Sequence, residues 1–439
     1  MSRKILAAAA AVIVGALAVA GGAQSSTSSR GASRDVVVEW NATMVDALLA
    51  SHTAPQPGTR VGAIVQTAVY DAVNGIGRRY AQFRPDAIDA TAPRGASEAA
   101  AAVGAAYTTL VALLPSQKDR FDAELAATLA TNNGESVARG FAWGQAVANA
   151  ILALRSTDGF STIPPPYVVG PLPAWQPTLP LFAGPVFRQF ANMTPWVMTS
   201  PAQFLPGLPP ALTSLRYTHD FYEVRDLGSL TSVTRTADQT AAAQFWNGTY
   251  DTVATLWNRV ADSLADRPDR SLAENARLFA LMNVAMADSV IAVWNAKNTY
   301  NTWRPITAIA NAGIYDNTGA SPDPSWRPLI PTPPHQEYPS GHSGVSAAAA
   351  AVLASFFGNE TSFSVSSDGV PGVASTSRSF SSFSDTVAEI AVARIAAGIH
   401  FRFACETAAS MGHEVAGYAI ATQMLPLHGN HDRQLGGGN

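Results

Sequence analysis

Residues 337–357 read EYPSGHSG followed by VSAAAAAVLASFF. The second part is an alanine-rich run of helix-forming residues, which predicts a helix that begins at the glycine and histidine. Ser340 stands where an N-cap is expected, and Gly341 lets backbone N–H groups approach a ligand closely. The start of a helix attracts anions, and His342 exchanges a proton near neutral pH. The stretch therefore predicts an anion site with an acid–base group, or an ordinary N-cap beside an incidental histidine.

Helical periodicity extends over most of the 439 residues. Apolar residues recur at three- and four-residue spacing before about residue 151 and again after about residue 232. A Gly/Ser/Phe-rich segment at 361–380 reads as a loop, and neither a strand-rich region nor a fixed-period repeat is visible. The fold class predicted from the sequence is all-α.

Changes in composition along the chain predict five segments. Prolines break the helical pattern in the middle of the chain, where the retained tryptophans and phenylalanines favour an ordered coil over a flexible linker. The expected segments are a signal peptide (1–23), an N-terminal helical region (34–155), a Pro-rich ordered coil (156–228), a catalytic helical bundle (229–427) and a frayed tail (428–439).

The N-terminus predicts export from the cytoplasm. A short basic start precedes an apolar, alanine-rich run that ends near Ala20 or Ala23, as in a secretory signal peptide. We therefore expect a secreted or periplasmic protein, with an uncleaved N-terminal anchor as the alternative. No later stretch is expected to span a membrane. The formal net charge of -4 does not suggest a nucleic-acid partner, and Cys405, the single cysteine, excludes an internal disulfide.

Two further clusters carry candidate anion ligands. Lys297 and Arg304 are seven residues apart, so their side chains project from one helix face, and Pro305 marks the end of that helix. Arg394 ends another helical pattern, and His400 follows a break at Gly398. Taken singly, the first pair also fits a solvated basic face, and the second fits a core histidine.

Together the clusters supply two arginines, a lysine, a helix N-terminus and two histidines, which is a donor set for a tetrahedral oxyanion. The order Lys297-x6-Arg304-Pro305, Pro339-Ser340-Gly341-His342, Arg394-x5-His400 resembles the three-part signature of the vanadium-dependent haloperoxidase and type 2 phosphatidic acid phosphatase superfamily. The flanking segments WRPLIPTPPHQEYPSGHS and FALMNVAMADSVIAVWNAKNTYNTWRPITAI look like the bacterial vanadium-haloperoxidase branch.

This resemblance implies an all-helical bundle of the vanadium haloperoxidase and acid phosphatase type, with an additional N-terminal helical region and a vanadate cofactor. It makes His400 the axial vanadium ligand and His342 the acid–base residue above the anion, while Lys297 activates the oxygen that halide attacks. The equatorial oxygens would be bound by Lys297, Arg304, Ser340, Gly341 and Arg394. The implied partners are hydrogen peroxide and a halide, with a small organic acceptor as a further candidate.

Three functions fit this donor set: a haloperoxidase, a phosphatase that forms a phosphohistidine at His400, and an anion-binding protein without catalysis. Many superfamily members carry Asp four residues after the third-cluster histidine, where this chain has Ala404. A phospho-accepting histidine benefits from a carboxylate partner, so we interpret Ala404 as favouring the haloperoxidase. Glu406 is not expected to replace that missing carboxylate.

Two supporting residues complete the prediction. Asp288 lies nine residues before Lys297 and is expected to be buried with Arg394 as its basic partner, or else to lie on the outer helix face. His335, seven residues before His342, corresponds to the halide-side position of resembling enzymes. A histidine there implies bromide or iodide oxidation in preference to chloride, unless it is a surface residue of the proline-rich loop.

Overall fold

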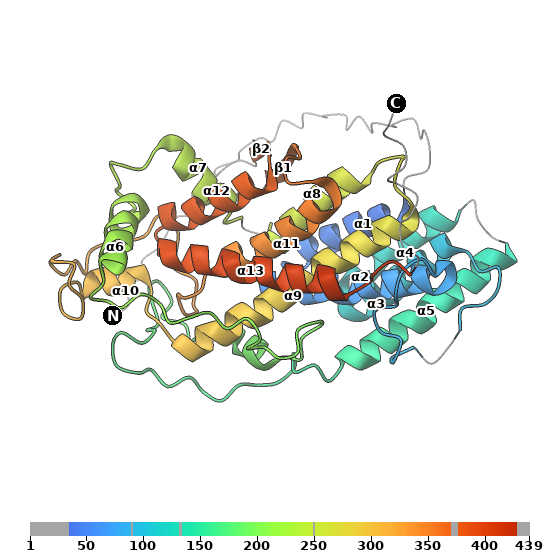
Figure 1. Cartoon of the computed structure of the whole chain (residues 1–439), viewed down its shortest axis with the longest axis horizontal. Coiled ribbons are helices and arrows are strands. Elements are labelled where there is room, and N and C mark those ends of the chain that lie inside the picture. Colours follow the sequence, from blue (N-terminus) through green and yellow to red (C-terminus); the bar gives the residue numbers. More distant parts are fainter. Residues whose placement is uncertain (1–34, 89–90, 131–133, 249–250, 370–375, 428–439) are drawn as a thin grey trace, which may run out of the picture. The chain divides into compact units, whose positions relative to one another are not determined.

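The computed structural model describes residues 35–88, 91–130, 134–248, 251–369 and 376–427 (Figure 1). The predicted signal peptide (1–23) and tail (428–439) lie outside the described residues. The described helices are α1 (Val36–Ala50), α2 (Pro55–Gly77), α3 (Glu98–Leu113), α4 (Lys118–Leu129), α5 (Glu135–Arg155), α6 (Leu215–Gly228), α7 (Ala237–Phe245), α8 (Val253–Ala265), α9 (Leu272–Tyr300), α10 (Pro305–Ala310), α11 (Gly341–Phe357), α12 (Phe383–Ala396) and α13 (Arg402–Thr422), with two short 3-10 helices, η1 (Pro115–Gln117) and η2 (Arg188–Asn192).

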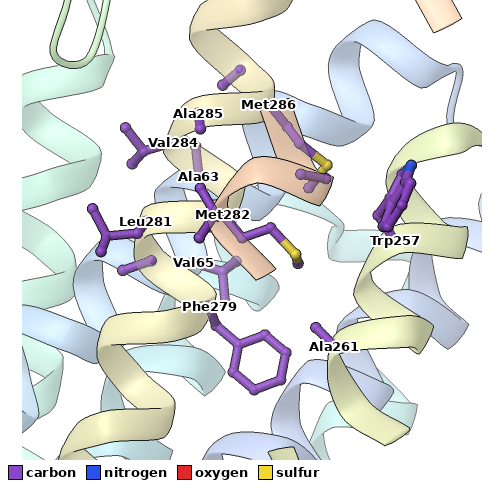
Figure 2. Close-up of a cluster of buried hydrophobic side chains, with 14 of the residues drawn as sticks. Ala63, Val65, Trp257, Ala261, Phe279, Leu281, Met282, Val284, Ala285 and Met286 are labelled. Carbon is purple, nitrogen blue, oxygen red and sulfur yellow. The ribbon is translucent and has the colours of Figure 1, made fainter. Parts of the chain in front are cut away.

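Helix α9 forms the centre of the fold. A capping box between Ser271 and Glu274 begins it, and the left-handed conformation of Asn301, with φ of 47°, ends it. Almost every face of α9 is buried, because α2, α11 and α13 all pack against it. Figure 2 shows Phe279 and Met282 of α9 within this core, beside Trp257 of α8. The helices before residue 156 and those after residue 229 therefore share one hydrophobic core.

Helices α11 and α13 pack at unusually close range. A Cβ atom at Gly412 of α13 would lie 2.1 Å from the carbonyl oxygen of Gly344 in α11, so only glycine fits there. The backbone N–H of Ser340, at the start of α11, donates to the carbonyl of Ala404 in α13 at 3.0 Å. These contacts fix the beginning of α11 against α13, where the predicted anion site lies.

The predicted coil at 156–228 is corrected at its end. Helix α6 occupies its last fourteen residues, capped by Ser214, whose hydroxyl accepts the N–H of Tyr217. Tyr217, Phe221 and Val224 recur at helical spacing and are buried, so the periodic signal was present but was assigned to the coil. The rest of the segment contains the 3-10 helix η2 and otherwise no α-helix or strand in its described residues.

The predicted loop at 361–380 is also corrected, because it contains strands β1 (Phe363–Ser367) and β2 (Thr376–Phe380). The two strands pair antiparallel, with Phe363 opposite Phe380. Phe363 and Val365 are buried while Ser364 and Ser366 are exposed, which is the two-residue period of a strand. Serines concealed this alternation in the sequence.

One helix differs from the expectation that no later stretch is apolar and long enough to cross a membrane. Helix α9 meets both criteria, but 94% of its most apolar window is buried inside the protein. Burial of this kind is typical of a central core helix.

Candidate oxyanion site

The ends of four helices bring the predicted site residues together. Lys297 lies in the last turn of α9, and Arg304 is the N-cap residue of α10. Arg394 lies in the last turn of α12, after which Gly398, with φ of +79°, turns the chain and places His400 just before α13. All four side chains are at most 2% exposed. The alternative of a solvated basic face is therefore wrong for Lys297 and Arg304.

Direct contacts connect the first and third clusters through Arg304. Its Nη1 atom donates to the carbonyl oxygen of Ile399 at 2.7 Å and lies 3.1 Å from Nε2 of His400. Its Nε donates to the carbonyl oxygen of His335 at 2.7 Å. Because a guanidinium group has only donors, Nε2 of His400 is an acceptor in this contact. The ring nitrogen predicted to bind vanadium thus carries no hydrogen, and its lone pair faces Arg304 Nη1.

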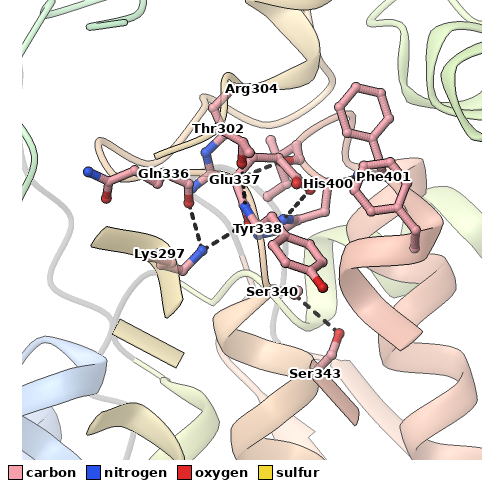
Figure 3. Close-up of polar contacts among 12 residues, drawn as sticks. Lys297, Thr302, Arg304, Gln336, Glu337, Tyr338, Ser340, Ser343, His400 and Phe401 are labelled. Carbon is pink, nitrogen blue, oxygen red and sulfur yellow. Dashed lines mark hydrogen bonds and ion pairs between the residues drawn. The ribbon is translucent and has the colours of Figure 1, made fainter. Parts of the chain in front are cut away.

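Backbone carbonyls also hold the other two cations. Lys297 Nζ donates to the carbonyl oxygens of Gln336 at 2.6 Å and Glu337 at 3.0 Å (Figure 3). Arg394 Nη1 makes longer contacts, of 3.4 Å to the carbonyl oxygen of Trp246 and 3.3 Å to Oδ1 of Asn247. The Nε of Arg394 has no hydrogen-bond partner among the described residues. Arg394 therefore keeps donor capacity for a ligand.

At the start of α11, Ser340 occupies the predicted N-cap position, but its side chain makes no capping bond. Its Oγ instead accepts a hydrogen bond from Oγ of Ser343 at 3.2 Å. A Cβ atom at Gly341 would lie 3.3 Å from the ring of Trp294, so this glycine keeps the first turn close to the indole. The hydroxyl of Ser340 and the first N–H groups of α11 remain donors for an anion.

A cavity of about 390 Å³ opens onto this site. Gly341 and the side chains of His342, Arg394 and His400 form part of its lining. Apolar side chains form another part, namely those of Val186, Phe187, Val290, Trp294 and Pro333. Lys297, Arg304 and Ser340 are not among the lining residues and lie behind the cavity wall. The acid–base candidate His342 is half-buried and lies on the cavity side of the site.

The electrostatic state of the site favours an anion. Burial lowers the pKa of Lys297 well below its usual value, and it lowers the pKa of Arg304 to about 9 and that of Arg394 to about 10. Burial and the neighbouring cations also hold the pKa values of His342 and His400 well below 6.5, so both imidazoles are neutral. The site fits vanadate or another tetrahedral oxyanion, because it offers three buried basic side chains. In addition, Nε of Arg394 has no partner among the described residues, and the hydroxyl of Ser340 makes no capping bond.

Glu337 is a site residue that sequence reasoning missed. Its Oε1 lies 2.9 Å from Nδ1 of His400, and the side chain is 1% exposed (Figure 3). His400 therefore has a carboxylate partner, and the interpretation of Ala404 as the loss of that partner is wrong. As expected, Glu406 does not replace it, because Glu406 pairs with Arg216 at 2.6 Å on the surface. The available signal was an acidic residue two positions before Pro339, where the PSGH motif begins.

The predicted burial of Asp288 is confirmed, but its predicted pairing with Arg394 is wrong. Asp288 is completely buried and accepts hydrogen bonds from the backbone N–H groups of Trp196, Val197 and Met198. The cation that lowers the pKa of Asp288 is Arg155, which opposes the rise caused by burial. Asp288 therefore fixes the coil beside α9 and does not contact the anion site.

His335, the predicted halide-side residue, is buried beside the cavity. The residue is 8% exposed and lines the cavity, so the alternative of a surface histidine is wrong. Its Nδ1 lies 2.9 Å from Nη2 of Arg304, and its ring centroid lies 5.2 Å from that of Trp294. Burial and Arg304 hold the pKa of His335 well below 6.5. A neutral imidazole therefore stands between Arg304 and the cavity.

Comparison with known proteins gives matches in both sequence and structure. A family model for the second helical-bundle domain of VCPO matches residues 277–429, which include all three clusters. The vanadium chloroperoxidase of Curvularia inaequalis is 31% identical over 140 residues, and this match spans only 22% of that protein's length.

Two solved bacterial structures cover most of the chain. The first bacterial vanadium-dependent iodoperoxidase has 27% identity and a TM-score of 0.77, with 90% of this chain and 98% of that chain covered. A holo-type bacterial vanadium-dependent chloroperoxidase has 18% identity and a TM-score of 0.63, with 84% and 91% covered, and supports the fold. With the buried three-cluster site, these likenesses show that the chain belongs to the vanadium haloperoxidase family.

Proposed function

We propose that this protein is a vanadium-dependent haloperoxidase that oxidises halide with hydrogen peroxide to hypohalous acid. The observation that carries the proposal is the unprotonated Nε2 of His400. It lies 3.1 Å from Nη1 of Arg304, in a buried group that also contains Lys297 and Arg394, beside the cavity. Likeness to the iodoperoxidase over 90% of the chain supports it.

The residues of the site divide into ligands and proton carriers. Lys297, Arg304, Arg394, Ser340 and the N–H groups of the α11 N-terminus would hold the vanadate oxygens, and His400 Nε2 would bind the metal. When bound, vanadate supplies a Lewis acid that activates peroxide without changing its oxidation state.

The acid–base role falls to His342. Its imidazole is neutral and lines the cavity, so it accepts a proton from incoming hydrogen peroxide and returns it to the leaving oxygen. Lys297 provides a buried positive charge that makes the transferred oxygen more electrophilic.

The halide specificity proposed from His335 is iodide and bromide over chloride. The imidazole lies between Arg304 and the cavity and adds polar hydrogen-bonding atoms beside the apolar residues Val186, Trp294 and Pro333. Larger halides are oxidised more readily, and the likeness to an iodoperoxidase agrees with this order. The cavity volume of about 390 Å³ also leaves space for a small organic acceptor.

One observation favours phosphatase activity as a second candidate. The carboxyl of Glu337 at Nδ1 of His400 gives this histidine the partner that a phosphohistidine nucleophile needs. The same cations would stabilise a pentacoordinate phosphoryl group.

The decisive experiment measures the vanadium content of the purified protein together with iodide and bromide oxidation, with and without added orthovanadate. Phosphomonoester hydrolysis is measured on the vanadate-free protein. Vanadate-dependent halide oxidation that His400→Ala abolishes is the expected result. Turnover that His400→Ala retains in full would overturn the ligand assignment, and efficient hydrolysis without halide oxidation would favour the phosphatase.

Export of the mature protein belongs to the same proposal. It is supported by the basic start and the alanine-rich apolar run within the first 23 residues. N-terminal sequencing of the protein recovered from the producing cells tests it, and a start near residue 21 or 24 is expected. An intact N-terminus on cytoplasmic protein would contradict export.

A further inference from the structure

The carboxyl of Glu337 makes two contacts through a single oxygen. Oε1 lies 2.9 Å from Nδ1 of His400 and accepts the backbone N–H of Phe401 at 3.0 Å. The other oxygen, Oε2, is buried and has no hydrogen-bond partner among the described residues. Two donors from adjacent residues thus converge on one acceptor and fix both the ring and the chain at the turn before α13.

The tautomer of His400 follows from contacts on both sides of its ring. On one side, Arg304 Nη1 is a donor, so Nε2 accepts. On the other side, Nδ1 carries the hydrogen and donates to Oε1 of Glu337. This assignment holds for an ionised and for a neutral carboxyl, because a carboxyl proton would occupy Oε2 and leave Oε1 an acceptor. Burial raises the pKa of Glu337 to about 7, and Lys297 opposes this rise.

The backbone of Glu337 is fixed as firmly as its side chain. Its N–H donates to the carbonyl oxygen of Thr302 at 3.2 Å, and its own carbonyl accepts from Lys297 Nζ at 3.0 Å. The next residue, Tyr338, donates its N–H to Oγ1 of Thr302 at 3.1 Å. One residue therefore connects a predicted oxyanion ligand, Lys297, to the predicted axial ligand, His400 (Figure 3).

We propose that Glu337 is a positioning residue that holds His400 in the Nδ1–H tautomer and directs the Nε2 lone pair at the central atom of a bound oxyanion. The inference rests on the proposed function. A hydrogen-bonded partner on the far nitrogen orients a metal-binding histidine and raises its basicity. Vanadium accepts a fifth ligand, whereas phosphate in simple binding uses only the oxygen contacts. Glu337 should therefore contribute to vanadate affinity much more than to phosphate affinity.

The test compares Glu337→Ala and Glu337→Gln with wild type in two measurements. Nitrogen NMR of histidine-labelled, vanadate-free protein reports the tautomer, with His400→Gln identifying the His400 signals among the eight histidines. Equilibrium dialysis gives the dissociation constants of vanadate and phosphate. Glu406→Ala is the matched control, because Glu406 is 51% exposed and bound to Arg216.

We expect the Nδ1–H form in wild type and in Glu337→Gln, which keeps an acceptor oxygen, and a mixture of tautomers in Glu337→Ala. Vanadate affinity should fall about 10- to 100-fold in Glu337→Ala, with phosphate affinity changed less than about threefold. The loss of vanadate affinity should be smaller in Glu337→Gln, and Glu406→Ala should bind vanadate as tightly as wild type. The retained phosphate affinity shows that the site is still folded.

An equal loss of vanadate and phosphate affinity, or no loss, would overturn the positioning role, as would an Nε2–H tautomer in wild type. Wild-type protein that binds vanadate no more tightly than phosphate would also overturn it. A different result would contradict the proposed function and leave the positioning role intact: vanadate binds as expected, but neither iodide nor bromide is oxidised.

Discussion

Replacement of Asp288 tests whether this buried acid supports the fold or the anion site. Asp288 accepts backbone N–H groups at 2.7 Å from Trp196, 2.8 Å from Val197 and 3.0 Å from Met198. Trp196 in turn packs on Arg155, whose guanidinium carbon lies 4.0 Å from the ring centroid. One carboxylate therefore fixes a coil segment, and through it a buried arginine, against the central helix.

The expected magnitude follows from the three donors. Each buried amide N–H left without an acceptor lowers the free energy of unfolding by about 1–3 kcal/mol. A water molecule that enters the space left by the carboxylate can accept from some of these N–H groups and so reduces the total loss. Asp288→Ala should therefore lower the free energy of unfolding by about 3–5 kcal/mol. Asp288→Asn keeps one acceptor oxygen but turns an NH2 group toward the remaining donors, so a loss of about 2–4 kcal/mol is expected.

Urea unfolding followed by tryptophan fluorescence measures the change. Asp46→Ala is the control, because Asp46 is 60% exposed and its contact with Arg120 is 3.7 Å long, so less than about 0.5 kcal/mol should be lost. Phosphate affinity of Asp288→Asn should stay within about threefold of wild type, since Arg394 does not contact Asp288. A loss of stability below about 1 kcal/mol, or a loss of phosphate affinity at full stability, would refute this reasoning.

Three further predictions concern the site. Sulfate, whose charge is constant above neutral pH, should raise the melting temperature by about 3 °C at a hundredfold excess over its dissociation constant. Burial lowers the pKa of Lys297 well below its usual value, and a bound sulfate would raise that pKa again, so the sulfate-induced rise in melting temperature should become smaller as the pH increases toward the usual pKa of lysine. A rise in melting temperature that grows with pH, measured by calorimetry, would contradict this. His335→Phe should raise chloride turnover relative to bromide roughly fivefold in steady-state halogenation assays, which corresponds to about 1 kcal/mol; wild-type chloride turnover as fast as bromide would remove the argument. Ala404→Asp should not increase phosphomonoester hydrolysis, because Glu337 already occupies Nδ1 of His400 and a second buried carboxylate destabilises the site; a clear increase would show that Glu337 is not the effective partner.

Periodicity in the sequence predicted the helical fold because most helices bury one face and so repeat apolar residues at helical spacing. It placed the start of α11 at Gly341, where the helix begins. The same reasoning failed at β1, where serines occupy the exposed positions of a two-residue alternation. It also failed at α6, where nearby prolines outweighed the periodic signal of Tyr217 and Phe221.

Within the site, residue types were predictable but long-range partners were not. His400 and Glu337 are 63 residues apart, and Asp288 is about 90 residues from the amides that it accepts. Such pairs depend on how helices pack, which sequence spacing does not determine. The interpretation of Ala404 was wrong for this reason. It considered only carboxylates at a fixed sequence distance from His400, whereas the actual partner comes from a distant part of the chain.

The contacts of Asp288 and Glu337, two of the buried acids, show how the protein keeps its cations available. Asp288 is stabilised by backbone amides, and Oε1 of Glu337 is used by His400 and Phe401, so neither forms a direct ion pair with a cation of the site. Lys297 and Arg304 are held mainly by backbone carbonyls, which accept hydrogen bonds but carry no full charge. Carbonyls thus fix the direction of each cation without neutralising it. Burying such cations costs stability, and a bound oxyanion offsets that cost, so affinity for the anion and stability of the fold rise together.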